Sequence, residues 1–398
     1  MVKSFDDELK EQLAEIRKQG LYRELRRVDS AQSPHIFIEG REFLNFSSND
    51  YLGLANAPVV REAARKAIDD FGAGAGASRL VCGSLAPHHE LEAALARFKR
   101  TEAALAFSSG YATALGTLGA LLDKTDIVIL DKLAHASLVD GARLCGAKLR
   151  VFAHNDLNAL EKILKWAAAQ PRSRPASSRS PRALVVTESV FSMDGDLALL
   201  REIIELKERH GAWLMLDEAH ATGLFGEHRR GLAEAYELAD RIEIQMGTLG
   251  KALGAAGGYI CGSRALIELL VNRARTFMFS TAPAPAVAAA ARATIEVTES
   301  SEGEERRTRL WARVDQLKSG LVGGRWELPV VRSAILPLMV GDENCAMELA
   351  ARLREVGVFV PAIRYPTVAR GRARLRMTVT AAHSEADVAA LISALRNA

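Results

Sequence analysis

The residue best placed to do chemistry in this sequence is a single lysine, Lys251, set among small residues. It lies in the run Gly247–Gly254 (Gly-Thr-Leu-Gly-Lys-Ala-Leu-Gly), and no other charged residue occurs between Met246 and Cys261. An ammonium group in a dry pocket has a lowered pKa and can act as an amine nucleophile or base. The pattern is typical of a lysine that forms a Schiff base with an aldehyde cofactor, although a loop lysine beside a glycine hinge would also produce it.

An acid and a histidine lie upstream of Lys251, directly after an apolar run. Trp213–Leu216 predicts a buried parallel strand, and Asp217 and His220 follow it. Ligands of open α/β sheets bind at the carboxyl ends of strands. Asp217 could therefore hold the protonated ring nitrogen of pyridoxal phosphate (PLP), a known partner of PLP lysines. A helix N-cap at Asp217 and a loop role for His220 remain alternatives.

Three further positions follow predicted strands. Ser108-Ser109-Gly110-Tyr111 leads into a helix, whose free amides and dipole would favour a phosphate, or whose serines only cap it. His135 could stack on a flat ring or bond at a helix entry. Ser192 could donate a hydrogen bond to a ligand or cap a turn.

The elements that must position these residues alternate along the chain. Apolar runs predict strands at 103–107, 127–130, 149–152, 183–186, 213–216 and 259–261, with helices at 136–145, 156–169 and 199–209. Such alternation implies an α/β fold with a doubly wound, mainly parallel sheet. After about residue 300 a charged helix (302–320) and strands at 334–340, 356–360 and 373–379 predict a smaller α+β domain. A helix at 4–18 and a hairpin at 36–46 precede them.

Composition limits the class of protein. The 398 residues are enough for a large core and two domains, and the 52 basic and 49 acidic residues leave a net charge of +3 that does not indicate nucleic-acid binding. Four separated cysteines show no metal spacing and are typical of reduced thiols in a cytosolic protein. The sequence shows no signal-peptide core and no membrane span. We therefore expect a cytoplasmic globular enzyme without a metal site.

Three loops carry open alternatives. The stretch 45–54 either caps structure or lines a site. Arg364, between two predicted strands, either grips a carboxylate through its two-pronged guanidinium or is a surface arginine. The basic, Ser/Pro-rich stretch 171–182 predicts a mobile surface loop, either a plain insertion or a docking loop for an acidic partner.

Together these runs resemble the α-oxoamine synthases, PLP-dependent enzymes of fold type I, along nearly the whole chain. The matching runs are 45–54, 131–137, 188–196, 217–220, 248–253 and 363–367. The resemblance implies a homodimer with shared active sites. It implies an N-terminal helix and hairpin (1–50), a large PLP-binding domain (51–295) and a small C-terminal domain (296–398).

The resemblance implies a decarboxylative condensation of an amino acid with an acyl thioester. The Asp-Glu-Ala-His form of 217–220 and the run 378–383 favour the member that joins L-alanine to a pimeloyl thioester, on coenzyme A or an acyl-carrier protein, in biotin synthesis. Tyr365 and Ala369-Arg370 depart from the pattern of that member and keep glycine-using members open. A general aminotransferase and a non-catalytic PLP-binding regulator are the remaining alternatives.

The resemblance also implies residue roles. Lys251 would hold PLP and act as the base, Asp217 would keep the ring nitrogen protonated, and His135 would stack on the ring. The residues implied to bind the cofactor are Gly110, Tyr111, Ser192, Asp217, His220, Thr248 and Lys251, with Ser280 and Thr281 of a neighbouring subunit at the phosphate. Those implied to bind substrate are Arg23, Asn49, His135, Arg364 and Thr367.

Overall fold

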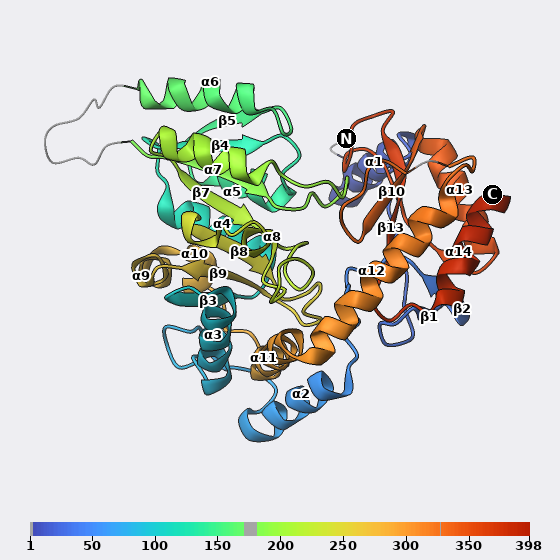
Figure 1. Cartoon of the computed structure of the whole chain (residues 1–398), viewed down its shortest axis with the longest axis horizontal. Helices are drawn as coiled ribbons and strands as arrows, with labels where there is room; N and C mark the ends of the chain where they lie inside the picture. Colours follow the sequence, from blue (N-terminus) through green and yellow to red (C-terminus); the bar gives the residue numbers. More distant parts are fainter. Residues whose placement is uncertain (1–2, 171–180, 327) are drawn as a thin grey trace, which may run out of the picture.

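The computed structural model describes residues 3–170, 181–326 and 328–398, and a seven-stranded sheet forms its larger lobe (Figure 1). In spatial order the strands are β3 (Ala103–Phe107), β9 (Gly258–Gly262), β8 (Ile244–Thr248), β7 (Trp213–Asp217), β6 (Ala183–Glu188), β4 (Ile127–Asp131) and β5 (Lys148–Phe152). From β8 to β5 all neighbours pair in parallel, while β9 is antiparallel to both β8 and β3. The expected mainly parallel α/β sheet is confirmed.

Both faces of this sheet are covered in its interior, which is why inner strands such as β4 and β6 are mostly apolar. In β4, Ile127 and Ile129 belong to the core on the face covered by α6 (Leu157–Ala168) and α7 (Leu200–Arg209). Val128 and Leu130 belong to the core on the opposite face, under α4 (Gly110–Leu121) and α5 (Ala136–Leu144). Successive side chains of a strand point to opposite faces, so one short apolar run serves two cores.

A third group of helices packs at the β3 and β9 edge. Leu95 and Phe98 of α3 (Ala86–Lys99) share a core with Tyr259 of β9 and with Ala291 of α11 (Pro285–Glu299). The other helices of this lobe are α2 (Pro58–Phe71), α8 (Leu232–Ala235), the 3-10 helix η1 (Ala239–Arg241), α9 (Arg264–Arg273) and α10 (Arg275–Met278).

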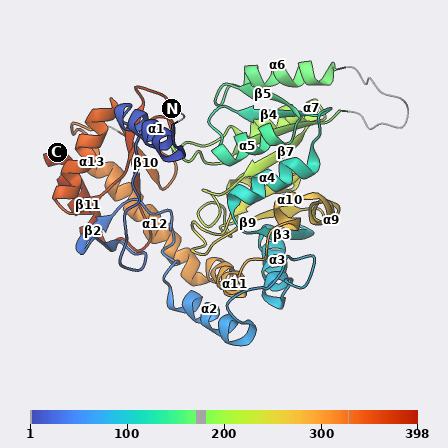
Figure 2. The same cartoon turned by 180° about the vertical axis from the view of Figure 1, so that it is seen from behind.

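The second lobe joins the two ends of the chain. An antiparallel sheet holds β10 (Ile335–Gly341), β13 (Ala373–Thr378) and β12 (Ala362–Ile363), with helices α12 (Ser301–Leu321), α13 (Glu343–Glu355) and α14 (Glu385–Asn397). The N-terminal hairpin of β1 (His35–Ile38) and β2 (Arg41–Asn45) pairs with β11 (Val358–Phe359). Figures 1 and 2 show both chain ends, and α1 (Phe5–Lys18), in this lobe.

The predicted elements agree with the observed ones to within a few residues at their ends, and the sequence analysis missed two of the observed strands, β8 and the two-residue β12. The three domain ranges remain predictions. Residues 171–180 of the basic stretch lie outside the described residues. Within the described part of the chain, no helix is long and apolar enough to cross a membrane.

Candidate active site

The candidate site lies where several parallel strands end together. The last residues of β4, β6, β7 and β8 are Asp131, Glu188, Asp217 and Thr248. Glu188 and Asp217 are register partners on neighbouring strands, and Asp217 pairs with Met246 of β8. The sheet therefore brings two carboxyl groups side by side, and the turn after β8 carries Lys251 toward them.

The amine of Lys251 contacts a histidine. Its Nζ lies 2.9 Å from Nε2 of His220. Desolvation by burial lowers the pKa of Lys251, opposed by the negative charges of Asp217 and Glu188 and reinforced by Arg376. A lowered pKa leaves more of this amine uncharged near neutral pH, as a nucleophile or proton acceptor requires.

His220 is buried and neutral. Its Nδ1 lies 2.7 Å from the hydroxyl of Tyr51, whose own exposed fraction is 0%. Burial, then the positive charges of Lys251 and Arg376, hold the pKa of His220 well below its usual value. With one ring nitrogen on each partner, His220 fixes the direction in which Lys251 points.

The two carboxyl groups at the strand ends, Asp217 and Glu188, each disfavour the ionised form of the other. Burial raises the pKa of Asp217, opposed by Lys251 and by the amide of Ala219, which donates to Asp217 Oδ1 at 2.9 Å. Burial and the neighbouring Asp217 raise the pKa of Glu188 well above its usual value, and its Oε1 is buried without a hydrogen-bond partner among the described residues. A cationic ring nitrogen beside Asp217 would supply the positive charge that this pair lacks.

His135 lies at the entry of α5. Its Nδ1 accepts from the amide of Ser137 at 3.2 Å and lies 2.8 Å from the hydroxyl of Ser137. Although His135 is exposed at the surface, desolvation by its surroundings lowers its pKa, followed by the charge of Lys251. The helix-entry bond weighed from the sequence is therefore present, and it leaves Nε2 and the ring face for other contacts.

The turn between β3 and α4 provides a cradle for an anion. Ser109 caps α4 by accepting from the amide of Ala112 at 3.0 Å, and the first amides of a helix lack partners within it. Gly258 lies so close that a Cβ there would come within 2.7 Å of Gly110 Cα. Thr248 borders Gly110, and a Cβ at Gly110 would meet its side chain at 3.8 Å.

The other predicted phosphate contacts are more dispersed. The hydroxyl of Tyr111 donates to Asp140 at 2.7 Å, and the side chain is exposed. Ser280 and Thr281 follow α10 and line a small cavity with Ser108 of the same chain. Their assignment to a neighbouring subunit remains a prediction.

The predicted substrate residues fall into two groups. Arg23 donates to Thr367 at 3.4 Å, and Arg364 donates to the main-chain oxygens of Gly20 at 3.1 Å and Tyr22 at 3.3 Å. In this structure Arg364 therefore anchors the segment after α1. Asn49 belongs to a separate group beside Tyr51, whose hydroxyl donates to Asn49 Oδ1 at 3.3 Å. The substrate role of each remains a prediction.

Sequence reasoning missed Arg376, which ties the two lobes together at the site. Both terminal nitrogens of this buried side chain donate to Asn49 Oδ1 at 3.1 Å, and its Nε donates to the main-chain oxygen of Ser192 at 2.6 Å. Its charge contributes to lowering the pKa of both Lys251 and His220. Arg376 alternates with Leu375 and Met377 in a fully buried strand, and a charge inside such a run is the signal that could have revealed it.

These residues fit PLP on three counts. The site has a half-buried amine of lowered pKa, a carboxyl pair short of positive charge, and a helix N-terminus that suits a phosphate. Amine, acid and anion cradle all lie at the carboxyl edge of one sheet, where α/β folds bind ligands.

Comparisons with known proteins agree with this arrangement. The family model "Aminotransferase class I and II" matches residues 41–395. The 8-amino-7-oxononanoate synthase of Geotalea daltonii is 46% identical over 385 residues, 97% of this chain and 96% of the relative.

Two solved structures are also similar. Serine palmitoyltransferase from S. paucimobilis, with a bound PLP–myriocin aldimine, has a TM-score of 0.90 and 30% identity, covering 98% of this chain and 96% of that one. The 8-amino-7-oxononanoate synthase of Francisella tularensis has a TM-score of 0.73 and 26% identity, covering 89% of this chain and 97% of that one.

Proposed function

Because this chain belongs to the class I and II aminotransferase family, we propose that it is a PLP-dependent acyltransferase that makes 8-amino-7-oxononanoate for biotin synthesis. It condenses L-alanine with a pimeloyl thioester and releases the thiol and CO2. The observation that carries the proposal is the 46% identity, over nearly the full length of both chains, to a synthase of that name.

The reaction joins the alanine Cα to the acyl carbon of the thioester. The C–S bond breaks, the thiol leaves with a proton, the bond from Cα to the alanine carboxylate breaks, and a proton takes its place. When bound, PLP supplies an electron-accepting ring that stabilises the negative charge developing at Cα. The protein must hold that ring, place an acid at its nitrogen and move protons at Cα.

The residues of the site suit these tasks. Lys251, with its lowered pKa, is the base that takes the Cα proton. When PLP is bound, Asp217 would hold the ring nitrogen and keep it protonated, and His135 would stack on the ring. His220 and Ser192 would hold its phenolic oxygen, and Tyr51 holds His220 in place through a 2.7 Å hydrogen bond.

Substrate and phosphate contacts complete the proposal. Gly110, Tyr111 and Thr248 would hold the phosphate of PLP, together with Ser280 and Thr281 of a second subunit in a homodimer. Arg364 grips the alanine carboxylate, and Arg23, Asn49 and Thr367 line the pocket. Since Arg364 now donates to Gly20 and Tyr22, gripping substrate requires it to exchange those partners.

The first alternative keeps the chemistry but changes the amino acid to glycine. Tyr365 favours such a member, for example 5-aminolevulinate synthase or 2-amino-3-ketobutyrate CoA ligase.

The second alternative is a serine-using synthase, because the TM-score of 0.90 to serine palmitoyltransferase exceeds the 0.73 to the Francisella synthase. TM-score measures the path of the backbone, whereas sequence identity also samples the side chains that contact substrate. The 46% identity to the Geotalea synthase therefore outweighs the higher TM-score.

The test is mass spectrometry of the products from a matched substrate panel. The purified protein is incubated with L-alanine, glycine or L-serine, each with pimeloyl-CoA, pimeloyl-acyl-carrier protein, acetyl-CoA, succinyl-CoA or palmitoyl-CoA. We expect 8-amino-7-oxononanoate from alanine with a pimeloyl thioester, and no product from the Lys251→Ala variant. A product formed only with glycine or serine would overturn the assignment, as would pyridoxamine formation without condensation.

A further inference from the structure

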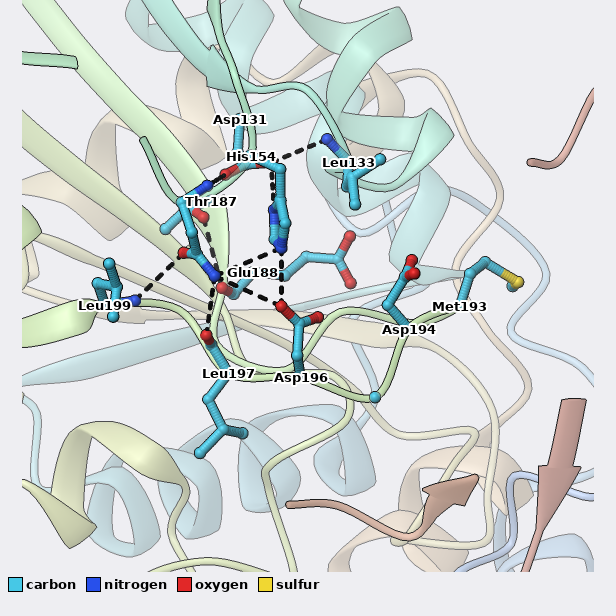
Figure 3. Close-up of polar contacts among 12 residues, drawn as sticks. Asp131, Leu133, His154, Thr187, Glu188, Met193, Asp194, Asp196, Leu197 and Leu199 are labelled. Atoms are coloured by element: carbon cyan, nitrogen blue, oxygen red, sulfur yellow. Dashed lines mark hydrogen bonds and ion pairs between the residues drawn. The ribbon is translucent and has the colours of Figure 1, made fainter. Parts of the chain in front are cut away.

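A histidine outside the proposed catalytic set lies between two carboxylates near the site (Figure 3). His154 Nδ1 is 3.0 Å from Asp131 Oδ1, and its Nε2 is 2.7 Å from Asp196 Oδ2. The ring lies edge-on to Phe191, with centroids 4.3 Å apart. Its side chain is 22% exposed, against 0% for Asp131 and 35% for Asp196, so the contact with Asp131 is sheltered from water.

This geometry defines the charge of His154. A carboxylate faces each ring nitrogen, so both nitrogens donate and the ring is an imidazolium. Desolvation opposes the charge, but the hydrogen bonds to Asp131 and Asp196 outweigh it and raise the pKa of His154 to about 10. With both nitrogens engaged as donors, the ring has no lone pair to offer a metal or a substrate proton.

The two carboxylates belong to two different segments of the site. Asp131 ends β4 and accepts from the amide of Leu133 at 2.8 Å, in the turn that leads to His135. Asp196 belongs to the loop that leaves β6 and carries Ser192. His154 therefore connects a segment that positions His135 with a segment that positions Ser192.

Asn155 repeats the connection. Its amide donates to Asp131 Oδ2 at 3.2 Å, and its side-chain nitrogen donates to the main-chain oxygen of Leu197 at 3.1 Å. Its side-chain oxygen accepts from the amide of Leu199 at 3.3 Å. His154 and Asn155 therefore both link the turn after β4 to the loop after β6, through side-chain and main-chain hydrogen bonds.

The far side of the same loop is held by β13. Arg374 donates to the main-chain oxygen of Met193 at 3.1 Å and to Asp194 at 2.6 Å, while Arg376 donates to the main-chain oxygen of Ser192. The loop lies between an anchor on the large sheet and an anchor on the small one. Without the first anchor, the loop would lose its side-chain contacts with the β4–β5 side of the large sheet and keep those with the small lobe, the two arginines among them.

We propose that His154 is a positioning residue for the reaction: held between Asp131 and Asp196, it keeps the His135 turn and the Ser192 loop in register around the Lys251 amine. This inference rests on the proposed function, in which His135 and Ser192 contact the cofactor. His154 touches neither substrate nor cofactor and acts through those two residues.

The test compares His154→Gln with His228→Gln in the full-length enzyme with its cofactor. His228 is a matched control because it also pairs with a carboxylate, Glu234, at 2.8 Å. In His154→Gln we expect kcat to fall by roughly tenfold or more, because a small displacement of catalytic groups slows the reaction by such a factor. We also expect PLP release to a trapping protein to accelerate by roughly fivefold, because the residues that contact PLP are held less firmly. His228→Gln should change neither quantity.

A purely structural role gives a different result. It lowers the Tm of His154→Gln while kcat and the PLP release rate, measured well below that Tm, stay within about twofold of wild type; that outcome overturns the proposal. Asp196→Asn loosens the same contact from its exposed side and carries the test if His154→Gln does not fold. The double variant should lose little more than either single one, since both remove one interaction.

The two readouts also separate this inference from the proposed function. PLP release does not depend on which acyl thioester is used. If no substrate pair gives product, the proposed function fails, and the release rates of His154→Gln and His228→Gln still decide the positioning role.

Discussion

At the scale of single residues, the pairing of Asp217 with Lys251 determines the chemistry. Both are desolvated, and desolvation moves their pKa values toward each other, down for the lysine and up for the acid. The charge of each residue favours the ionised form of the other, so a change at one residue alters the protonation of both. A cationic ring nitrogen at Asp217 would favour the ionised carboxylate.

Asp217→Asn tests this pairing. The amide keeps the shape but cannot stabilise a protonated ring nitrogen, so we expect kcat/KM to fall by roughly a hundredfold or more, the scale of losing one preorganised electrostatic contact. The acid also raises the pKa of the Lys251 amine, so the pH dependence with which the cofactor-free protein forms its visible imine with added PLP should move to lower pH. Absorbance titrations and steady-state kinetics measure both effects.

Asp240→Asn is the control: Asp240 is the exposed middle residue of η1, and this variant should match wild type in both measurements. An Asp217→Asn enzyme with kcat/KM within about threefold of wild type would contradict the assignment of the ring-nitrogen partner, because such a difference is under 1 kcal/mol of transition-state stabilisation.

At the scale of elements, the loop from Ser189 to Leu199 connects β6 to α7 and brings the two lobes into contact. Gly195 has φ +69°, and a Cβ there would lie 2.4 Å from the main-chain oxygen of Ile335 in β10. The hydroxyl of Ser333 donates to the Gly195 oxygen at 2.8 Å. The loop and β10 meet backbone to backbone, which only glycine permits at this position.

Gly195→Ala and Gly211→Ala separate crowding from backbone strain. Both glycines have positive φ, but nothing lies within 4 Å of a Cβ at Gly211. Each alanine should cost about 1–2 kcal/mol for the left-handed backbone, and Gly195→Ala should add about 1–3 kcal/mol of overpacking. Thermal unfolding should show a larger fall in Tm for Gly195→Ala, with loss of activity in that variant alone. Equal falls in Tm would show that the loop can move away from β10.

Elements with a strong local pattern were predictable from sequence. The unbroken apolar run of β4 predicts a strand and the charged pattern of α12 predicts a helix, and both elements are found where expected. β8 was missed because Ile244-Gln245-Met246-Gly247-Thr248 mixes polar and small residues. It forms a strand because β7 and β9 pair with it on both sides, a tertiary cause that no local pattern contains.

At the scale of the whole molecule, the candidate site depends on contacts between distant parts of the chain. Lys251, Asp217 and His220 were identified from sequence because glycine-rich turns and strand ends mark them locally. Arg376 was not, since its partner Asn49 lies 327 residues away. Tyr51 was not assigned a role either, because its contact with His220 exists only once the stretch 45–54 packs against the large sheet.

The central claim is that Lys251, among all the lysines of the chain, carries the aldehyde cofactor. Borohydride reduction of the PLP-loaded protein converts an imine into a stable amine, and peptide mass spectrometry then locates the pyridoxyl group. The account predicts one modified peptide, which bears the pyridoxyl group on Lys251, and no such peptide from the Lys251→Ala variant. A pyridoxyl group on any other lysine of the wild-type protein would contradict it.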